Sequence, residues 1–145
     1  IQTNPGERMR PLAKIASGGE LSRMMLALKT IFSESQGITS IIFDEVDTGV
    51  SGRVAQAIAE KINGIAHFSQ VLCITHLPQV AAMSDHHYFI AKKITGKRTK
   101  TSVTKLDNAA RVQELARMLA GTKVTKLSLE HAEELLRLAD EEKDD

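Results

Sequence analysis

The sequence predicts an α/β protein with a parallel βαβ core, a β-hairpin at the edge of the sheet and two C-terminal helices. Two short segments rich in β-branched residues, 38–43 and 71–75, are typical of strands that are buried on both faces. Between them, apolar side chains recur with helical spacing at Val54, Ile58, Ile62 and Ile65. A strand, a helix and a second strand joined by short links almost always form a right-handed crossover with parallel strands.

The composition is that of an ordinary soluble globular domain. Of the 145 residues, 42% are hydrophobic and 26% are charged, which excludes wholesale disorder. Nineteen Lys and Arg against eighteen Asp and Glu give a net charge of +1, so a nucleic-acid contact must come from a local patch. A single cysteine cannot form an intramolecular disulfide and favours a reducing, intracellular compartment. No apolar run approaches the ~18 residues that a membrane span needs.

The first part of the chain predicts a linker and then an amphipathic helix. Residues 1–16 contain two prolines and begin without Met, so we expect a linker that enters the domain from a longer protein. Gly37 is expected to end the helix that follows. Its apolar stripe, which we expect to be core, consists of Leu21, Met24, Met25, Leu28, Ile31 and Phe32.

Residues 88–94 and 99–106 flank a turn and predict the edge hairpin. Its basic side chains could contact DNA phosphates, although no aromatic residues alternate with them. The commoner explanation is an edge strand that lysines protect from pairing with other chains. These side chains are Lys92, Lys93, Lys97, Arg98 and Lys100.

Two helices are predicted to close the chain. The first begins at an Asp107 or Asn108 cap and stops at Gly121. The acidic residues 141–145 are expected to form a frayed, solvated tail. The second helix carries an apolar stripe at Leu129, Ala132, Leu136 and Ala139.

The segment Ser17-Gly18-Gly19-Glu20 opens the first helix and has two interpretations. Ser17 and Glu20 fit a capping box, in which the glutamate reaches back to the serine that caps the helix. The capping box leaves the paired glycines unexplained, because each costs about 1 kcal/mol relative to Ala in a helix. Glycines in the first turn leave backbone N–H groups open to an anion at the positive end of the helix dipole. We favour phosphate binding over a cap alone.

Asp44 and Glu45 directly follow the first predicted strand. The ordinary explanation is that Asp44 or Asp47 caps the next helix. However, ligands bind at the carboxyl ends of the strands in an α/β sheet. Two carboxylates there suit Mg²⁺-dependent nucleotide hydrolysis, in which the Asp holds the hydrated metal and the Glu polarises the attacking water.

His76 follows the second predicted strand. A lone His in such a place is usually a polar residue with a structural partner. Because the carboxyl ends of parallel strands meet at one edge, we expect His76 near Asp44 and Glu45, within reach of a terminal phosphate or the attacking water. Cys73 is expected to be a small buried hydrophobe. The remaining histidines lack the spacing of a metal site and are His67, His86, His87 and His131.

The order and spacing of these segments resemble the second half of an ABC-type ATPase head. Residues 17–22 are similar to the signature motif, residues 41–45 to the Walker B strand, and Asp47 to the D-loop. His76 is similar to the switch histidine. The resemblance is closer still to the RecN family of bacterial DNA-repair proteins, which are related to the SMC ATPases. It covers most of the chain and is carried by residues 11–23, 43–52, 75–81 and 111–119.

The resemblance implies that the first helix binds nucleotide across a dimer. The signature residues Ser17, Gly18, Gly19 and Glu20 would then bind the γ-phosphate of an ATP that the opposite head mainly holds. Ala16 and Glu20 stand where transporter-type members more often have Leu and Gln, a pair that the SMC-like branch tolerates.

The resemblance also implies the hydrolytic roles. Asp44 would order Mg²⁺ through water, and Glu45 would be the general base. Asp47 would couple the two sites of the dimer, and His76 would contact the γ-phosphate. These roles make ATP and Mg²⁺ the expected cofactors.

The chain lacks the G-x-x-x-x-G-K-[ST] loop that wraps phosphates, and it also lacks the Gln of the Q-loop. In the family that loop lies in an N-terminal half, before a long coiled coil. The resemblance therefore implies that residues 17–140 are a returning C-terminal lobe with little ATPase activity alone. Its expected partners are the N-terminal Walker A lobe, a second head in an ATP-gated homodimer and double-stranded DNA, in a cytoplasmic, nucleoid-associated setting. The alternative is a non-catalytic ATPase-like docking module for DNA or a protein.

Overall fold

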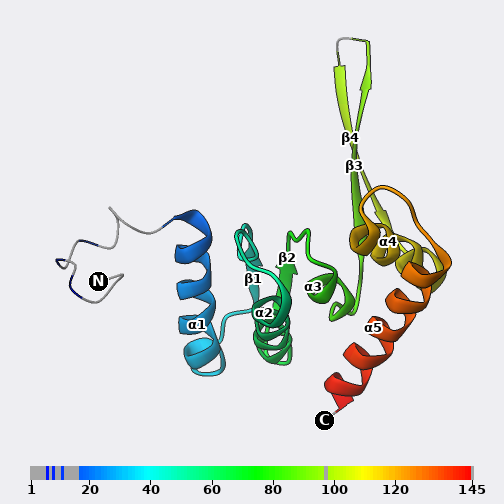
Figure 1. Ribbon diagram of the computed structural model, residues 1–145. Coiled ribbons are helices and arrows are strands. Elements are labelled where there is room, and N and C mark those ends of the chain that lie inside the picture. Colours follow the sequence, from blue (N-terminus) through cyan, green and yellow to red (C-terminus); the bar gives the residue numbers. More distant parts are fainter. Residues whose placement is uncertain (1–5, 7, 9–10, 12–16, 97, 145) are drawn as a thin grey trace. The chain divides into compact units, whose positions relative to one another are not determined.

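The computed structural model describes most of the chain: Gly6, Arg8, Pro11 and residues 17–96 and 98–144. The chain divides into two compact units, residues 1–75 and 76–145. Each unit combines helices with a two-stranded sheet, so the predicted α/β class is confirmed (Figure 1). The linker expected at 1–16 lies almost entirely outside the described residues. The single lobe expected over 17–140 stays a prediction, because the two units are described separately.

Helix α1 (Gly18–Gln36) begins and ends where the sequence predicts. Ser17 is its N-cap, and Gly37 closes it in the left-handed conformation, with a φ of 60° that glycine adopts without strain. The prediction that Met24 and Met25 are core is wrong for this chain, because they are 41% and 48% exposed. The helix packs against α2, and Leu26 is buried, so the predicted apolar stripe is left largely open.

The βαβ unit forms as predicted from β1 (Ser40–Phe43), α2 (Gly52–Ala66) and β2 (Gln70–Cys73). The two strands pair in parallel, and Phe43 lies opposite Cys73. The buried side of α2 is shifted from the predicted stripe, because Val54 is 52% exposed. Its buried residues are Ala55, Ile58, Ala59 and Ile65.

One face of the β1–β2 sheet is open, which corrects the prediction of strands buried on both faces. Successive strand residues point to opposite faces. Phe43 is 5% exposed, whereas its neighbour Ile42 is 68% exposed and Leu72 on β2 is 50% exposed. Within the described part of the first unit, the sheet is therefore covered on a single side.

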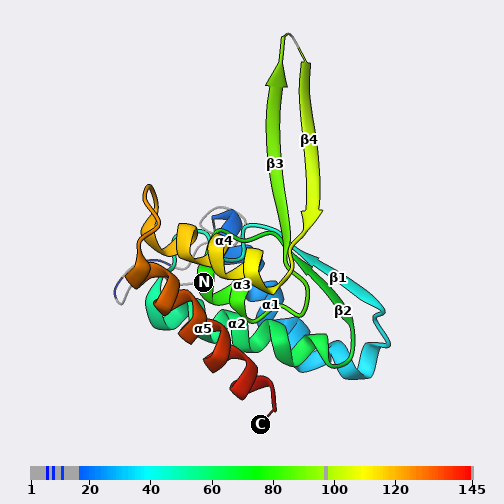
Figure 2. The same cartoon turned by 90° about the vertical axis from the view of Figure 1, so that its right-hand side faces the viewer.

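The second unit begins with the short helix α3 (Pro78–Ala82) and continues into a hairpin of β3 (Tyr88–Thr95) and β4 (Arg98–Lys105). The hairpin is confirmed, with eight antiparallel residue pairs. Its predicted position at the edge of the βαβ sheet is wrong: in the described chain, β3 and β4 pair with each other as a separate sheet. In Figures 1 and 2 this ribbon extends away from the helices of its own unit.

Helices α4 (Asn108–Ala120) and α5 (Lys126–Asp144) complete the second unit and pack against each other. Asp107 caps α4, its carboxylate accepting the Ala110 N–H at 2.8 Å, and Gly121 ends the helix, both as predicted. The core of the unit includes Leu115, Ala116, Ala132 and Ala139.

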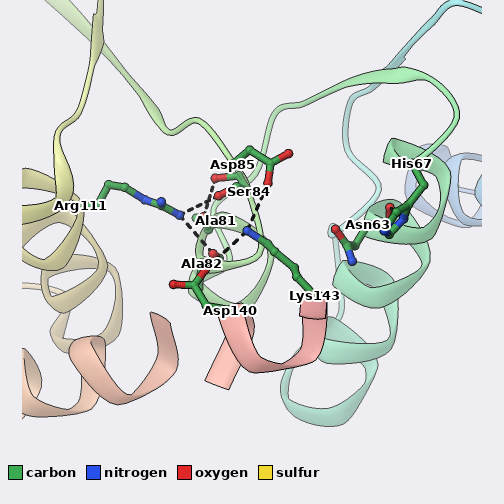
Figure 3. Close-up of polar contacts among 9 residues, drawn as sticks. All are labelled: Asn63, His67, Ala81, Ala82, Ser84, Asp85, Arg111, Asp140 and Lys143. Atoms are coloured by element: carbon green, nitrogen blue, oxygen red, sulfur yellow. Dashed lines mark hydrogen bonds and ion pairs between the residues drawn. The ribbon is translucent and has the colours of Figure 1, made fainter. Parts of the chain in front are cut away.

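Helix α5 continues through residues that were expected to form a solvated tail. Its last turn contains Lys143, whose Nζ lies 3.3 Å from an Asp85 carboxylate oxygen and 3.7 Å from one of Asp140. Arg111 of α4 similarly donates to the carbonyl oxygens of Ala82 and Ser84 at the end of α3 (Figure 3). Side chains from α4 and α5 thus hold the end of α3. No helix in the described ranges is both long and apolar enough to cross a membrane.

Candidate functional site

The site lies at the carboxyl ends of the two parallel strands. The strand pairing continues past β2, because the Ile74 N–H donates to the Phe43 carbonyl at 3.0 Å. Asp44 and Thr75, which follow directly, therefore leave the sheet at the same edge. This is the edge at which α/β sheets bind ligands.

The loop after β1 holds Glu45 in a strained conformation. Glu45 has a φ of 58°, and it is the single non-glycine residue with positive φ in the described chain. The left-handed region costs a residue with a side chain roughly 1–2 kcal/mol. Such strain persists where the surroundings enforce it, and it concentrates at functional sites. Asp44 and Glu45 are both exposed, so their carboxylates are accessible to a ligand.

Helix α1 fastens this loop through two side chains near its N-terminus. The Ser22 hydroxyl donates to the Asp44 carbonyl at 3.0 Å. Arg23 donates through Nη1 to the Thr48 carbonyl at 2.8 Å and, less closely, to the Val46 carbonyl at 3.4 Å. The predicted signature segment and the predicted Walker B loop, far apart in the sequence, therefore lie side by side.

The paired glycines allow that close approach. A Cβ on Gly19 would lie 3.1 Å from the Thr48 carbonyl oxygen and 3.2 Å from that of Glu45, tighter than ordinary packing. A Cβ on Gly18 would lie 2.7 Å from Oε2 of Glu45. The structure thus gives Gly19 a steric reason that the sequence did not suggest, because it faces the backbone of the loop that carries Glu45, whereas Gly18 faces only the end of the flexible Glu45 side chain.

The capping box predicted at the start of α1 is confirmed. The Glu20 N–H donates to Ser17 Oγ at 3.3 Å, and the Ser17 N–H donates to Glu20 Oε2 at 2.7 Å. The hydrogen bond from the Ser17 backbone is the main cause that lowers the pKa of Glu20, and the Ser17 side chain adds to it. Phosphate binding at this segment stays a prediction beside the cap.

Asp47 is an internal residue of the loop. It is 2% exposed, and its carboxylate accepts the Thr75 hydroxyl hydrogen bond at 2.5 Å. The ordinary explanation, that Asp44 or Asp47 caps the next helix, is wrong, because the N-cap of α2 is Ser51. Asp47 instead ties the loop after β1 to the end of β2.

Cys73 lies half-buried on β2. Burial, reinforced by the nearby negative charges of Asp47 and Asp44, raises the pKa of the Cys73 thiol to about 12. The thiol is therefore protonated near neutral pH, as expected of a small packing residue without a nucleophilic role.

His76 is exposed and opens the second unit, so its predicted nearness to Glu45 stays a prediction. The Nδ1 of His67, at the end of α2, lies 3.0 Å from the Asn63 carbonyl (Figure 3). His87 is half-buried; burial first, and then the charge of Arg111, lowers its pKa, while Glu114 opposes this. No group of three His, Cys, Asp or Glu in the described ranges could hold a metal ion.

Sequence reasoning assigned no role to Arg23 or Thr75, although both fasten the loop. Their contacts are with carbonyls of Val46 and Thr48 and with Asp47, far from them in sequence. Both residues lie within the segments that carry the family resemblance, which is the one signal that marks them.

The sequence of the chain is similar to those of known proteins. No family model matches the chain. The chain is 66% identical over 139 residues to the DNA repair protein RecN of Halalkalibacterium halodurans, covering 96% of this chain and 25% of that protein. It is 62% identical over 143 residues to that of Bacillus subtilis, with 99% and 25% covered. For Treponema pallidum the identity is 51% over 137 residues, with 94% and 24% covered.

The chain thus spans about a quarter of the length of the curated relatives it matches. The similarity extends over nearly the whole chain and includes every residue segment of the candidate site. The comparisons confirm the resemblance inferred from the motifs: over nearly its whole length, this chain is similar to a segment of the RecN DNA-repair proteins.

Proposed function

We propose that this chain is the C-terminal lobe of an ATP-hydrolysing, SMC-like head that acts in DNA double-strand-break repair and recombination. The observation that carries the proposal is the strained Glu45, held against the first turn of α1 with its Oε2 beside Gly18. A loop that served only to connect β1 with α2 has no need of such strain. The names of the relatives support a part in DNA repair.

Glu45 is proposed as the general base that polarises the attacking water. Asp44 is proposed to hold Mg²⁺ through water, and this fits an exposed carboxylate, since Mg²⁺ keeps several waters and binds proteins through one or two carboxylates. Bound Mg²⁺ supplies the charge that neutralises the phosphates. His76 is proposed to contact the γ-phosphate.

The start of α1 is proposed to bind ATP that a second head holds. Ser17, Gly18, Gly19 and Glu20 would form this trans-acting segment, at the positive end of the helix dipole. Asp47 is buried, so its coupling of the two sites is proposed to act through the loop that it fastens. The partners are the N-terminal Walker A lobe, a second copy of the head and double-stranded DNA. The setting proposed is the cytoplasm, at the nucleoid.

The open apolar surface of the first unit supports a missing lobe as a partner. Ile42, Leu72 and Ile74 are each at least half exposed on the β1–β2 sheet. A hollow that Ile42 helps to line is otherwise formed mainly by residues of α1 and β1, among them Met25 and Phe43. Contiguous exposed apolar surface marks interaction sites. The alternative, a non-catalytic docking module, explains this surface equally but gives no reason for the strain at Glu45.

The proposed role of Glu45 is tested with the Glu45→Gln variant of a protein that contains the N-terminal lobe as well as this chain. Hydrolysis is expected to fall by ~10²–10⁴-fold, the usual contribution of a general base, while ATP binding is retained. Phosphate release and nucleotide affinity are measured in parallel. Hydrolysis at the wild-type rate would remove Glu45 as the base and favour the docking module.

A second variant tests the trans-acting segment. Ser17→Arg places a bulky cation where the second head is proposed to present its nucleotide, so ATP-dependent dimerisation is expected to be lost. Light scattering with and without ATP measures it. Unaltered dimerisation would contradict the signature assignment while leaving the role of Glu45 open to its own test.

A further inference from the structure

The β3–β4 hairpin concentrates positive charge in a chain that is otherwise acidic. Residues 88–105 contain six of the nineteen Lys and Arg and none of the eighteen Asp and Glu. The rest of the chain therefore has thirteen basic against eighteen acidic residues, a balance of −5 against +6 in the hairpin. A near-zero net charge thus conceals a strongly basic element, the local patch that a polyanion requires.

The strand register sorts these cations by face. Residues directly opposite in an antiparallel pair share a face, and faces alternate along each strand. Lys93 is opposite Lys100, and Arg98 lies on the same face nearer the turn. The other face carries Ile90 opposite Val103, together with Tyr88, Ile94, Lys92 and Lys105. One face of the hairpin thus has three cations, together with Phe89 and Ala91, and is referred to below as the basic face; the other face is more apolar.

The Lys93–Lys100 pair is unfavourable for the hairpin by itself. Like charges directly opposite each other on a ribbon are destabilising, whereas opposite charges contribute roughly 0.2–1 kcal/mol. Protection of an edge strand from aggregation needs charge, but a mixture of Lys and Glu serves that purpose without repulsion. A uniformly positive face is therefore better explained by an anionic partner than by edge protection.

The ribbon has a shape and an accessibility that suit a nucleic acid. All eight residues of β4 are exposed, and in Figures 1 and 2 the hairpin extends away from α3, α4 and α5. Eight residues at about 3.3 Å each span roughly 26 Å. The major groove of B-DNA admits a two-stranded β-ribbon, and phosphates line its rims.

We propose that the basic face of the β3–β4 hairpin, Lys93, Lys100 and Arg98, binds the phosphates of double-stranded DNA. This inference rests on the proposed function in DNA repair, and it assigns the DNA contact to residues other than those proposed to bind nucleotide. The hydroxyl of Thr104 lies on the same face and can donate to a phosphate oxygen, whereas the Ser102 hydroxyl donates to the Ala91 carbonyl at 3.4 Å. No base-reading residue is required, so the contact is expected to be independent of sequence.

Fluorescence anisotropy of the 145-residue chain with a labelled 30-base-pair duplex, over a range of salt concentrations, tests the proposal. The double variant Lys93→Ala/Lys100→Ala is expected to reduce the slope of log affinity against log salt by about 2, because each phosphate that a lysine no longer neutralises lowers the slope by close to one. Lys92→Ala/Lys105→Ala is the matched control, since it removes two lysines from the other face of the same ribbon. Circular dichroism checks that both variants keep their fold.

Each other outcome overturns the proposal. If the slope falls equally in both double variants, DNA binding depends on the net charge of the hairpin and not on its basic face. If the wild-type chain does not bind the duplex, or binds poly-glutamate equally well, DNA phosphate is not the ligand. The Glu45→Gln experiment measures phosphate release without DNA, so failure here and failure of the proposed function are distinguishable.

Discussion

The backbone conformation of Glu45 predicts an unusual effect on stability, namely that Gly is more stable than Ala at this position. At almost any position in a helix or strand, replacing Ala with Gly destabilises a protein. At Glu45, with a φ of 58°, we expect the opposite, because Gly enters the left-handed region without the penalty that Ala pays. That penalty is roughly 1–2 kcal/mol, and the greater chain entropy of Gly in the unfolded state offsets about 0.5–1 kcal/mol of it. The Glu45→Gly variant is therefore expected to be more stable than Glu45→Ala by ~0.5–1 kcal/mol.

Ala57 supplies the matched control. It is an exposed residue in the middle of α2, in the same unit as Glu45, and has no special φ. The Ala57→Gly variant is expected to lose about 1 kcal/mol relative to Ala. Both variants at position 45 lack the glutamate side chain, so the effect of losing it cancels when their stabilities are compared.

Urea denaturation followed by far-ultraviolet circular dichroism measures both comparisons. With an m-value of about 2 kcal/mol/M, each 1 kcal/mol moves the midpoint by roughly 0.5 M. The two sites are expected to move it in opposite directions. If Gly is less stable than Ala at position 45 as well, the left-handed strain does not exist, and the observation on which the proposed function rests is lost.

Two further predictions concern the loop and the strand beneath it. Thr75→Val removes a donor to the buried Asp47 carboxylate at nearly constant volume. Because a hydrogen bond to a charged group is worth about 1.5–3 kcal/mol, the free energy of unfolding is expected to fall by that order. Thr104→Val on exposed β4 is expected to change it little, and equal losses would contradict the role of Thr75 in fastening Asp47. With a pKa of about 12, the Cys73 thiol is expected to react with iodoacetamide far more slowly at pH 8 than a free cysteine, and the reaction rate is expected to rise with pH. If Cys73 in the folded chain reacts at the rate of a free cysteine, its thiol is not held protonated.

Local sequence signals predicted the elements well, because each depends on neighbouring residues. The Ser17 and Glu20 capping box, the Gly37 stop and the Asp107 cap are short-range hydrogen-bonding or φ requirements. They can be identified within a window of four or five residues. The alternation of the hairpin strands is equally local, and their pairing is confirmed.

Burial and strand order were predicted less well, since both depend on polypeptide distant in sequence. An apolar stripe such as Met24, Met25 and Leu28 indicates which side of a helix is meant to be covered, but not whether this segment covers it. The 68% exposure of Ile42 has the same origin. The prediction that the hairpin lies at the edge of the βαβ sheet was wrong, because an alternation of β-branched residues identifies a strand but does not determine which strand pairs with it.

The site itself was predicted as a set of residues, but its mechanics were not. The glycines were explained as an opening for an anion, and the structure shows that Gly19 also lies against the backbone of a protein loop. Side chains that donate to backbone carbonyls, as Arg23 does, leave no pattern, because any residue supplies a carbonyl. Such contacts become visible only when α1 and the loop are placed together.

These contacts explain how the strain at Glu45 is sustained. A residue in the left-handed region returns to an ordinary conformation unless its surroundings prevent it, and the required restraint is roughly 1–2 kcal/mol. Ser22 and Arg23 hold the loop from α1, and Thr75 holds Asp47 from the end of β2. The neutral bond from Ser22 is worth about 0.5–1.5 kcal/mol, and the two that involve a charged group, Arg23 or Asp47, are worth about 1.5–3 kcal/mol each, so together the three exceed the strain. The conformation of Glu45 is therefore set by contacts from two elements, α1 and the end of β2, so a displacement of either one is expected to change where its carboxylate points.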